Sequence, residues 1–445
     1  ALLLRQHRAI QTDSRRLEAG SIFLALKGEH FDGHDYLDHI QALGACAAIV
    51  DAIQPVPGLA QIALGDTRAA LLQLGRAWRR QFAIPMIAVT GSNGKTTTKE
   101  MIASILAAWL GEKHRLATLG NLNNELGVPL TLLRLRHEHQ AAVIELGMNH
   151  PGEIAVLARV TEPTVALVNN AQREHQEFMA NVEAVARENA AVYAALMPEG
   201  IKVFPSADTF SQLWLELTSE RSTLRFGMDA QAEVWASHIQ ADALGTRFIV
   251  HTPIGEGRVT LSVPGEHNVL NALAAATCAV AAAVPMQAIE QGLAAFNAVS
   301  GRMQPHRLAK GIVLIDDSYN ANPDSVRAAI DVLASLPIPR VLVLGDMGEV
   351  GDHGAAMHEE VGAYARERGI SHLLTLGQAT RLSAAAFGPQ AIVCETHDEA
   401  SDWIAQHPVK SVLIKGSRFM RMEKIGRTCL EQFEATDKDV VKHAI

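Results

Sequence analysis

The residues best suited to chemistry form a glycine-rich segment at 90–98, which reads TGSNGKTTT. Glycine, lysine and threonine in this order are typical of a loop that binds the phosphates of a nucleotide. Gly91 and Gly94 would let the backbone approach a phosphate closely, and Lys95 could reach the terminal phosphates. Thr96 could place its hydroxyl on Mg²⁺. The segment therefore predicts a site for a nucleoside triphosphate.

The residues on either side of this segment would place it at the start of a helix. An apolar run at 84–89 predicts a buried strand before the loop, and the spacing at 97–108 predicts a helix after it. Free backbone N–H groups and the positive end of the helix dipole attract phosphate there. The usual pattern has a glycine six residues before the lysine, where this chain has Val89, so we expect a tighter loop. The alternative is a glycine-rich turn with a surface lysine.

Other reactive side chains follow predicted strands, at the edge where open α/β sheets bind their ligands. Glu145 lies at the end of a predicted strand at 142–146 and is a candidate Mg²⁺ ligand opposite Thr96. His175 follows a predicted strand at 165–168 and is a candidate for a second metal or a polar contact. A histidine satisfied by ordinary hydrogen bonds is the alternative.

Two asparagine-rich segments and one basic segment are further candidates for binding. The asparagines at 120–125 (GNLNNE) and 316–323 (DDSYNANP) could bind peptide or sugar groups without adding charge. They could equally form turns and helix caps, and the sequence leaves both readings open. The segment 415–418 (KGSR) follows a predicted strand and offers two cations to a carboxylate or phosphate. An ordinary basic helix start is its alternative.

The elements that must position these residues divide the chain into three regions. Residues 1–82 predict a small N-terminal α/β domain, and residues 83–305 alternate strands and helices in the doubly wound pattern around a central P-loop sheet. A β-rich insert is expected at 246–263, and residues 306–445 predict a C-terminal Rossmann-like domain. We expect further strands at 202–204, 312–315, 341–344, 373–375 and 412–414, and helices at 182–196, 325–334, 355–368 and 399–406. Short hinges should join the three domains.

Composition excludes several classes of protein. The net charge of -9 argues against nucleic acid as a partner, and the 5% aromatic content favours helix-rich α/β layers. The 4 cysteines have no C-x-x-C spacing, which predicts reduced thiols in a cytoplasmic protein. The longest apolar stretch, 272–284, is too short for membrane insertion. No signal peptide is recognisable, and without a methionine at Ala1 we expect a few native residues to precede it.

The chain resembles the Mur ligases, the ATP-dependent amino-acid ligases of peptidoglycan synthesis. The resemblance rests on the TGSNGKTTT loop, the strand carrying Glu145, the segment 170–175, GEHNVLN at 265–271 and Gly301–Arg302. Within the family, DDSYNANPDS (316–325), LGDMGEVG (344–351), KGSRFMRME (415–423), TDSR (12–15) and GSIFLALKGEHFDGHDY (20–36) look like members that join D-alanyl-D-alanine to UDP-N-acetylmuramoyl-tripeptide. Members that add the third stem residue typically carry an Asp-Asn-Pro-Arg motif, which this sequence lacks.

The resemblance implies a mechanism, cofactors and site residues. The γ-phosphate of ATP would pass to the substrate carboxylate, and the incoming amine would attack the resulting acyl phosphate. Catalytic roles are implied for Lys95, Glu145 and His175, and Mg²⁺ binding for Thr96, Glu145 and His175. ATP contacts are implied for Gly91, Ser92, Asn93, Gly94, Lys95, Thr96, Thr97, Asn268, Asn271, Arg302 and Asp317. The UDP-sugar would be held by Ser14, Arg15, Phe31, Asp32, Gly33 and His34, the peptide stem by Asn123 and Asn124, and the dipeptide by Asn320, Asn322, Lys415, Ser417 and Arg418.

One position departs from the family pattern. Many Mur ligases carry a lysine after the histidine segment, and its carbamate helps to bind a second metal; Asn189 takes that place here. The alternatives to the implied function are another Mur or folylpolyglutamate-type ligase, or an ATP-binding regulatory module. Whether the third stem residue is diaminopimelate or lysine stays open, and we expect a monomer.

Overall fold

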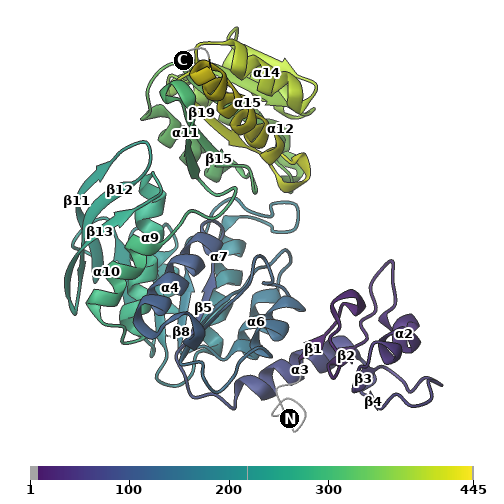
Figure 1. The fold of residues 1–445 in the computed structure, drawn as a ribbon. Coiled ribbons are helices and arrows are strands. Elements are labelled where there is room, and N and C mark those ends of the chain that lie inside the picture. The colour runs from purple at the N-terminus through teal and green to yellow at the C-terminus, as the bar shows by residue number, and fades with distance from the viewer. Residues whose placement is uncertain (1–8, 218, 443–445) are drawn as a thin grey trace.

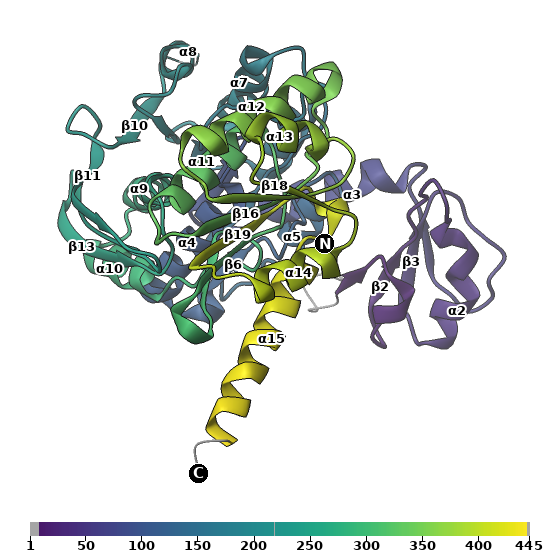
Figure 2. The same cartoon turned by 90° about the horizontal axis from the view of Figure 1, so that it is seen from above.

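The computed structural model describes residues 9–217 and 219–442, which form three α/β domains (Figure 1). The predicted fold class is confirmed. The N-terminal sheet contains four parallel strands in chain order: β1 (Ile10–Gln11), β2 (Ile22–Leu24), β3 (Ala47–Val50) and β4 (Gln61–Ala63). Helix α2 (Leu37–Ala42) packs on this sheet through Leu37 and Ile40. The N-terminal domain extends to one side of the other two, as Figure 2 also shows.

Helix α3 (Thr67–Arg79) connects the first domain to the second. Asp66 caps it by accepting from the backbone N–H groups of Arg68 and Ala69. Its last turn packs on the central domain, where Trp78 Nε1 donates to the carbonyl of Leu135 at 3.1 Å. Arg79 is buried there, and its guanidinium donates to three backbone carbonyl groups. The predicted boundary at residue 82 assigns α3 to the N-terminal domain. The C-terminal half of this helix nevertheless contacts the central domain.

The central domain is built on a nine-stranded sheet with the order β13-β12-β11-β10-β9-β8-β5-β7-β6. Its strands are β5 (Met86–Thr90), β6 (Arg115–Ala117), β7 (Ala141–Glu145), β8 (Val165–Val168), β9 (Ile201–Pro205), β10 (Ser222–Gly227), β11 (Val234–Ala241), β12 (Thr246–Thr252) and β13 (Gly255–Leu261). The strands from β6 to β11 pair in parallel, whereas β12 and β13 pair antiparallel. These two strands form the β-rich insert predicted at 246–263. Because β5 lies between β7 and β8, three strands end side by side there.

Helices cover both faces of the central sheet. They are α4 (Lys95–Leu110), α5 (Gly127–Leu132), α6 (Glu153–Thr161), α7 (Val182–Ala190), α8 (Ser211–Glu216), α9 (Glu266–Ala281) and α10 (Met286–Ala295). Successive residues of β5 serve the two layers: Met86 and Ala88 pack with α5 and α6, and Ile87 and Val89 pack with α4 and α9. The helix predicted at 182–196 ends at Ala190 and continues as a 3₁₀ helix over Ala191–Ala195.

The C-terminal domain has a six-stranded sheet with the order β14-β15-β19-β16-β17-β18. Its strands are β14 (Gln304–Arg307), β15 (Val313–Asp317), β16 (Arg340–Gly345), β17 (His372–Leu376), β18 (Ala391–Cys394) and β19 (Ser411–Lys415), parallel except for β14. Helices α11 (Pro323–Ala334), α12 (Gly354–Glu367) and α13 (Thr380–Phe387) lie on one face, and α14 (His397–Gln406) and α15 (Glu423–Lys442) on the other (Figure 2). In the described part of the chain, no helix is both long and apolar enough to cross a membrane.

Candidate functional site

The loop between β5 and α4 has the geometry that its glycines predict. Gly94 is the N-cap of α4 with φ 79°, and Gly91 has φ 130°. A Cβ atom at Gly91 would lie 2.9 Å from the backbone nitrogen of Asn169, and one at Gly94 would collide with the side chain of Asn271. Both positions therefore need glycine for conformation and for space. The first backbone N–H groups of an α-helix have no partner within the helix, so those of α4 can face an anion at this loop.

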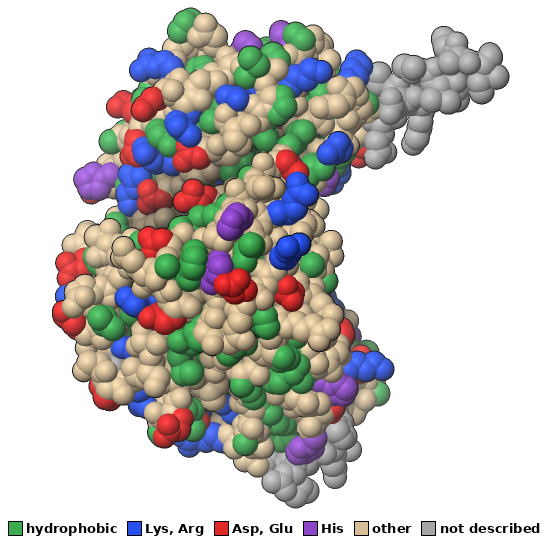
Figure 3. Space-filling model, turned by 90° about the vertical axis from the view of Figure 1, so that its left-hand side faces the viewer, with side chains coloured by type: hydrophobic (Ala, Val, Ile, Leu, Met, Phe, Trp, Pro, Cys, Tyr) green, Lys and Arg blue, Asp and Glu red, His purple; other side chains and the backbone are tan. Residues whose placement is uncertain are grey.

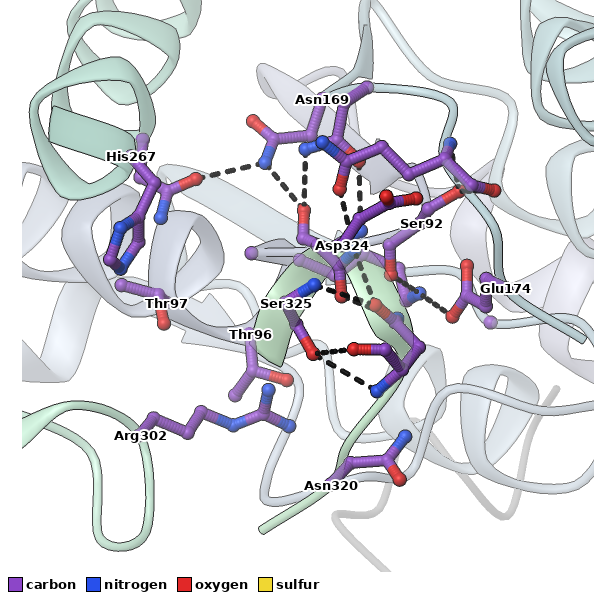
Figure 4. A pocket seen from close by; sticks show the side chains of 18 of the residues that line it. Ser92, Thr96, Thr97, Asn169, Glu174, His267, Arg302, Asn320, Asp324 and Ser325 are labelled. Carbon is purple, nitrogen blue, oxygen red and sulfur yellow. Dashed lines mark hydrogen bonds and ion pairs between the residues drawn. The ribbon is translucent and has the colours of Figure 1, made fainter. Parts of the chain in front are cut away.

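A cavity of about 880 Å³ lies between the central and C-terminal domains, next to this loop. In Figure 3 the molecule is narrower where the C-terminal domain, above, meets the central domain, below. The central domain lines the cavity with the phosphate loop, the ends of β7 and β8 and the start of α9, and the C-terminal side lines it with residues 301–303, 317, 319–322 and Lys415. Figure 4 shows Thr96 and Thr97 of the central domain facing the same cavity as Arg302, Asn320 and Asp324. Its volume is within the usual range for cofactor sites.

Lys95 is folded back over its own loop. Its Nζ donates to the carbonyl oxygens of Gly91 at 2.6 Å and Ser92 at 2.9 Å, and to Glu174 Oε1 at 2.9 Å. Burial alone would raise the pKa of Glu174, but the charges of Lys95 and His175 outweigh it and lower that pKa. Glu174 is thus a buried carboxylate that balances the loop lysine. A phosphate at the loop would compete with Glu174 for the same ammonium group.

Glu145 lies at the end of β7, directly beside the phosphate loop. Its side chain is almost fully buried, and its Oε1 accepts from Thr96 Oγ1 at 3.1 Å and from Asn123 Nδ2 at 2.8 Å. Its Oε2 has no hydrogen-bond partner among the described residues. A buried carboxylate oxygen without a partner is costly unless something binds it. A hydroxyl and a carboxylate at this spacing fit Mg²⁺, which prefers one or two carboxylates together with phosphate oxygens.

His175 connects the central domain to the C-terminal one. Its Nε2 lies 3.3 Å from Glu174 Oε1, and its Nδ1 lies 2.6 Å from Oε2 of Glu349, in the loop after β16. Burial alone would lower the pKa of His175, but these two carboxylates raise it to about 9. Both His175 and Glu349 have positive φ, of 52° and 59°, which is uncommon for residues other than glycine. His175 can bind a metal only after losing its proton and one of these contacts.

Two asparagines of α9, Asn268 and Asn271, form hydrogen bonds next to the phosphate loop. Asn271 Oδ1 accepts from Asn169 Nδ2 at 2.9 Å and from Thr98 Oγ1 at 3.3 Å. Asn271 Nδ2 donates to Asn268 Oδ1 at 3.2 Å, and Asn268 Nδ2 donates to the carbonyl of Pro264 at 2.7 Å. Both residues line the cavity. They form a buried hydrogen-bonded network that fixes α9 to the loop.

Arg302 and Asp317 approach the cavity from the hinge and the C-terminal domain. The guanidinium of Arg302 stacks 4.0 Å from the ring centre of Tyr319, and its Nε has no hydrogen-bond partner among the described residues. Asp317 accepts from Lys415 Nζ at 2.6 Å and from the backbone nitrogen of Met303 at 3.0 Å. These residues place both signs of charge opposite the phosphate loop.

The remaining candidates on the asparagine-rich and basic segments have mixed roles. Asn124 Oδ1 accepts from the backbone N–H of Gly127, the first residue of α5, at 2.9 Å. Asn322 caps α11 and donates to Asn93 Oδ1 of the phosphate loop at 2.9 Å. Ser417 accepts from the backbone nitrogen of Gly348, and Arg418 lies 3.0 Å from Glu423. Asn320 is exposed at the cavity. Asn124, Asn322 and Ser417 thus have structural hydrogen bonds, whereas Asn320 faces space that a ligand could fill.

The six candidates of the N-terminal domain form a separate surface. Arg15 is exposed and lies 2.8 Å from Asp13, and Ser14 begins the same 3₁₀ helix. Asp32 caps the next 3₁₀ helix, in which Gly33 packs against the backbone and His34 Nε2 accepts from Asp51 N at 3.0 Å. Phe31 is 52% exposed. Among the described residues that line the 880 Å³ cavity, none belongs to this group.

Sequence reasoning missed three charged residues that surround His175. Arg173 and Glu174 precede it directly, and Glu349 lies in the segment LGDMGEVG. The two charged residues next to His175 could have been chosen as candidates from the sequence alone. Their contacts could not be predicted, because Arg173 lies 151 positions from Asp324 and 187 from Glu360 in the chain.

Comparison with known proteins agrees with this architecture. Three family models match: "Mur ligase family, catalytic domain" over residues 7–105, "Mur ligase middle domain" over 89–279 and "Mur ligase, glutamate ligase domain" over 301–418. The UDP-N-acetylmuramoyl-tripeptide--D-alanyl-D-alanine ligase of Escherichia coli is 40% identical over 95% of this chain and 94% of its own length. The ligase of the same name from Haemophilus influenzae is 36% identical over 94% of this chain and 92% of its own.

Solved structures extend the likeness to the fold. MurF from Acinetobacter baumannii has a TM-score of 0.88 and 37% identity, covering 97% of this chain and 98% of that one. MurF ligase from Thermotoga maritima in complex with ADP has a TM-score of 0.85 and 25% identity, covering 98% and 99%. Folylpolyglutamate synthase from Mycobacterium tuberculosis, at 18% identity and a TM-score of 0.66, shares the fold. With family models along most of its length and such relatives, this chain belongs to the Mur ligase family.

Proposed function

We propose that this protein joins D-alanyl-D-alanine to UDP-N-acetylmuramoyl-tripeptide, with ATP converted to ADP and phosphate, in the cytoplasm. The observation that carries the proposal is the 880 Å³ cavity, in which the phosphate loop faces Arg302, Asp317, Asn320 and Lys415. The names of the relatives that match nearly the whole chain support the choice of substrates. The N-terminal surface of Ser14, Arg15 and residues 31–34 is proposed to hold the UDP-sugar.

The reaction proceeds in two steps on this geometry. The carboxylate of the tripeptide attacks the γ-phosphorus of ATP, which forms an acyl phosphate and releases ADP. The amine of the dipeptide then attacks the acyl carbon, loses a proton, and expels inorganic phosphate. The protein mainly positions the groups and neutralises charge. The Lys95 ammonium group leaves its contact with Glu174 and binds the phosphates of ATP, and the backbone N–H groups at the start of α4 point toward the same phosphates.

Mg²⁺ is proposed to be held by Thr96 and Glu145, whose unpartnered Oε2 fits such an ion. When bound, it would neutralise charge on the phosphates of ATP. His175 is the candidate for a second ion, although both of its ring nitrogens face carboxylates in this structure. Asn123, hydrogen-bonded to Glu145, would place the peptide stem beside the same site.

Release of phosphate should require all three substrates together. Because the reacting groups are proposed to come from separate domains, ATP with either partner alone should give only background turnover. The measurement is phosphate release with ATP, the tripeptide precursor and D-alanyl-D-alanine, each omitted in turn. Appreciable release with free D-alanine or L-amino acids would favour another ligase of the family. Nucleotide binding without substrate-dependent turnover would favour a regulatory module.

Activity should not depend on bicarbonate. Asn189 is fully buried, accepts from Thr90 Oγ1 at 2.6 Å and donates to the carbonyl of Val185 at 3.0 Å, so its amide belongs to the core. The neighbouring Glu188 caps α6 through Gly152 N and Ile154 N. Since an amide has no amine to capture CO₂, no carbamate can form at this position.

The test is turnover in CO₂-depleted buffer with and without added bicarbonate, at several Mg²⁺ concentrations. We expect equal rates, and a higher Mg²⁺ requirement than in relatives that have the lysine, because one anionic oxygen ligand is missing. Activity that disappears on CO₂ depletion and returns with bicarbonate would refute this assignment of Asn189.

A further inference from the structure

Arg173 of the central domain makes side-chain hydrogen bonds to two acidic residues of the C-terminal domain, Asp324 and Glu360. It lies in the loop after β8, two residues before His175. Its Nη2 is 2.5 Å from Asp324 Oδ1, at the start of α11, and its Nη1 is 2.6 Å from Glu360 Oε2, on α12. Its Nε and Nη2 make further hydrogen bonds to the same two carboxylates at 3.0 Å. One guanidinium thus holds two helices of the other domain.

We propose that Arg173 is a positioning residue for ligation: by binding Asp324 and Glu360 together, it holds the C-terminal domain over the phosphate loop in the arrangement in which the amine meets the acyl phosphate. The kinetic part of this proposal rests on the proposed function. Its structural part, the relative position of the two domains, does not. Arg173 lies outside the lining of the cavity, so its effect on the reaction must act through the residues it holds.

The geometry distinguishes this contact from an ordinary surface ion pair. An exposed ion pair adds little to stability, because water weakens the attraction and fixing two long side chains costs conformational entropy. Here the side chains of Arg173, Asp324 and Glu360 are only 27%, 23% and 32% exposed, and the planar fork meets each carboxylate through two nitrogens. Such forked contacts fix orientation as well as distance, which a lysine at the same place would not do.

The acceptors are themselves held in place. Arg327 Nη1 donates to Glu360 Oε1 at 3.1 Å, and the Arg327 guanidinium stacks 3.9 Å from the ring centre of Tyr364. Asp324 lies in the first turn of α11, where the helix dipole favours a negative charge. The C-terminal domain therefore presents a prepared pair of carboxylates to a single cation from the central domain.

The contact also reaches the phosphate loop through the backbone. The backbone N–H of Arg173 donates to Asp324 Oδ2 at 2.8 Å, which fixes the loop that continues into Glu174 and His175. Glu174 binds Lys95, and His175 faces Glu349. A shift of the C-terminal domain would therefore move the segment that balances the charge of Lys95.

The experiment is a double-mutant cycle with Arg173→Ala, Glu360→Gln and both together. Neither position lines the cavity. We expect Arg173→Ala to lower kcat by on the order of tenfold to a hundredfold, because small misplacements of reacting groups are costly, while the Kd of ADP changes by less than about threefold. The double variant should lose no more than Arg173→Ala alone, because both changes break one contact. Small-angle scattering with ADP bound should show a larger radius of gyration for both Arg173 variants than for the unchanged protein.

Arg187→Ala is the matched control, since Arg187 pairs with Glu183 within α7 at 2.8 Å and does not reach the other domain. It should leave kcat and the scattering unchanged. Three results would overturn the proposal: normal kcat and scattering in Arg173→Ala, fully additive losses in the cycle, or a loss of ADP binding as large as the loss of kcat. If the unchanged protein shows no ligation, the proposed function fails, and the scattering comparison still decides whether Arg173 holds the domains.

Discussion

Replacement of Lys95 with alanine should lower turnover by on the order of a thousandfold while the protein stays folded. The Lys95 ammonium lies within 2.9 Å of Ser92 O and Glu174 Oε1, so it is already held at the loop that receives the phosphates. Removing it takes away the cation that would counter charge on the transferring phosphoryl group. Alanine is favourable at the first position of α4, so the helix should persist.

The measurement is kcat in the ligation assay, with thermal unfolding as the check on folding. Lys113→Ala is the control, because Lys113 is an exposed lysine of the same domain and its loss changes the net charge equally. We expect its turnover to match that of the unchanged protein. Near-normal turnover in folded Lys95→Ala would show that this loop is not the catalytic nucleotide site.

The phosphate loop could be predicted because its determinants are local. The strand, the glycines with positive φ and α4 all lie within residues 86–110, and periodicity alone identifies the strand and helix on either side. The same holds for β15, β16, β17 and β19 of the C-terminal domain, which agree with the predicted ranges to within a few residues, whereas β14 and β18 were not predicted. The position of Glu145 beside the loop could also be predicted, because the carboxyl ends of neighbouring parallel strands meet at one sheet edge.

The contacts between distant residues could not be predicted in the same way. Nothing near Arg173 in the sequence indicates that Asp324 and Glu360 will meet it, and nothing near Lys95 indicates Glu174 as its partner. Helix α3 shows the same limit for packing, since its amphipathic pattern says that one face is buried but not against which domain. The tertiary partner of such a face is decided only by the folded chain.

The asparagine-rich segments show why a residue type alone does not decide a role. Asn124 and Asn322 accept hydrogen bonds from helix N-termini, as asparagine does in many caps, whereas Asn320, two residues from Asn322, is exposed at the cavity. Asn322 combines a cap with a contact to Asn93 of the phosphate loop. A cap can thus also carry an interdomain contact, so the two readings of these segments do not exclude each other.

Glu145→Gln should lower kcat by on the order of a hundredfold at Mg²⁺ concentrations that saturate the unchanged protein, and should raise the Mg²⁺ concentration needed for half-maximal rate. Glutamine has nearly the same shape as glutamate, so the contact with Thr96 can persist. The change replaces an anionic carboxylate with a neutral amide, and the buried Oε2, which has no partner among the described residues, is the atom proposed to meet the ion.

Titrating Mg²⁺ separates a metal role for Glu145 from a packing role. A ligand lost from a metal site weakens binding, so added Mg²⁺ should recover part of the rate, whereas a packing defect would not respond to the ion. Glu183→Gln, at an exposed residue of α7 that contacts Arg187, removes the same charge and should leave the Mg²⁺ dependence unchanged. A folded Glu145→Gln protein with an unaltered Mg²⁺ requirement would exclude this carboxylate as a ligand. Glu145 Oε2, which has no hydrogen-bond partner among the described residues, would then need an explanation other than a metal ion.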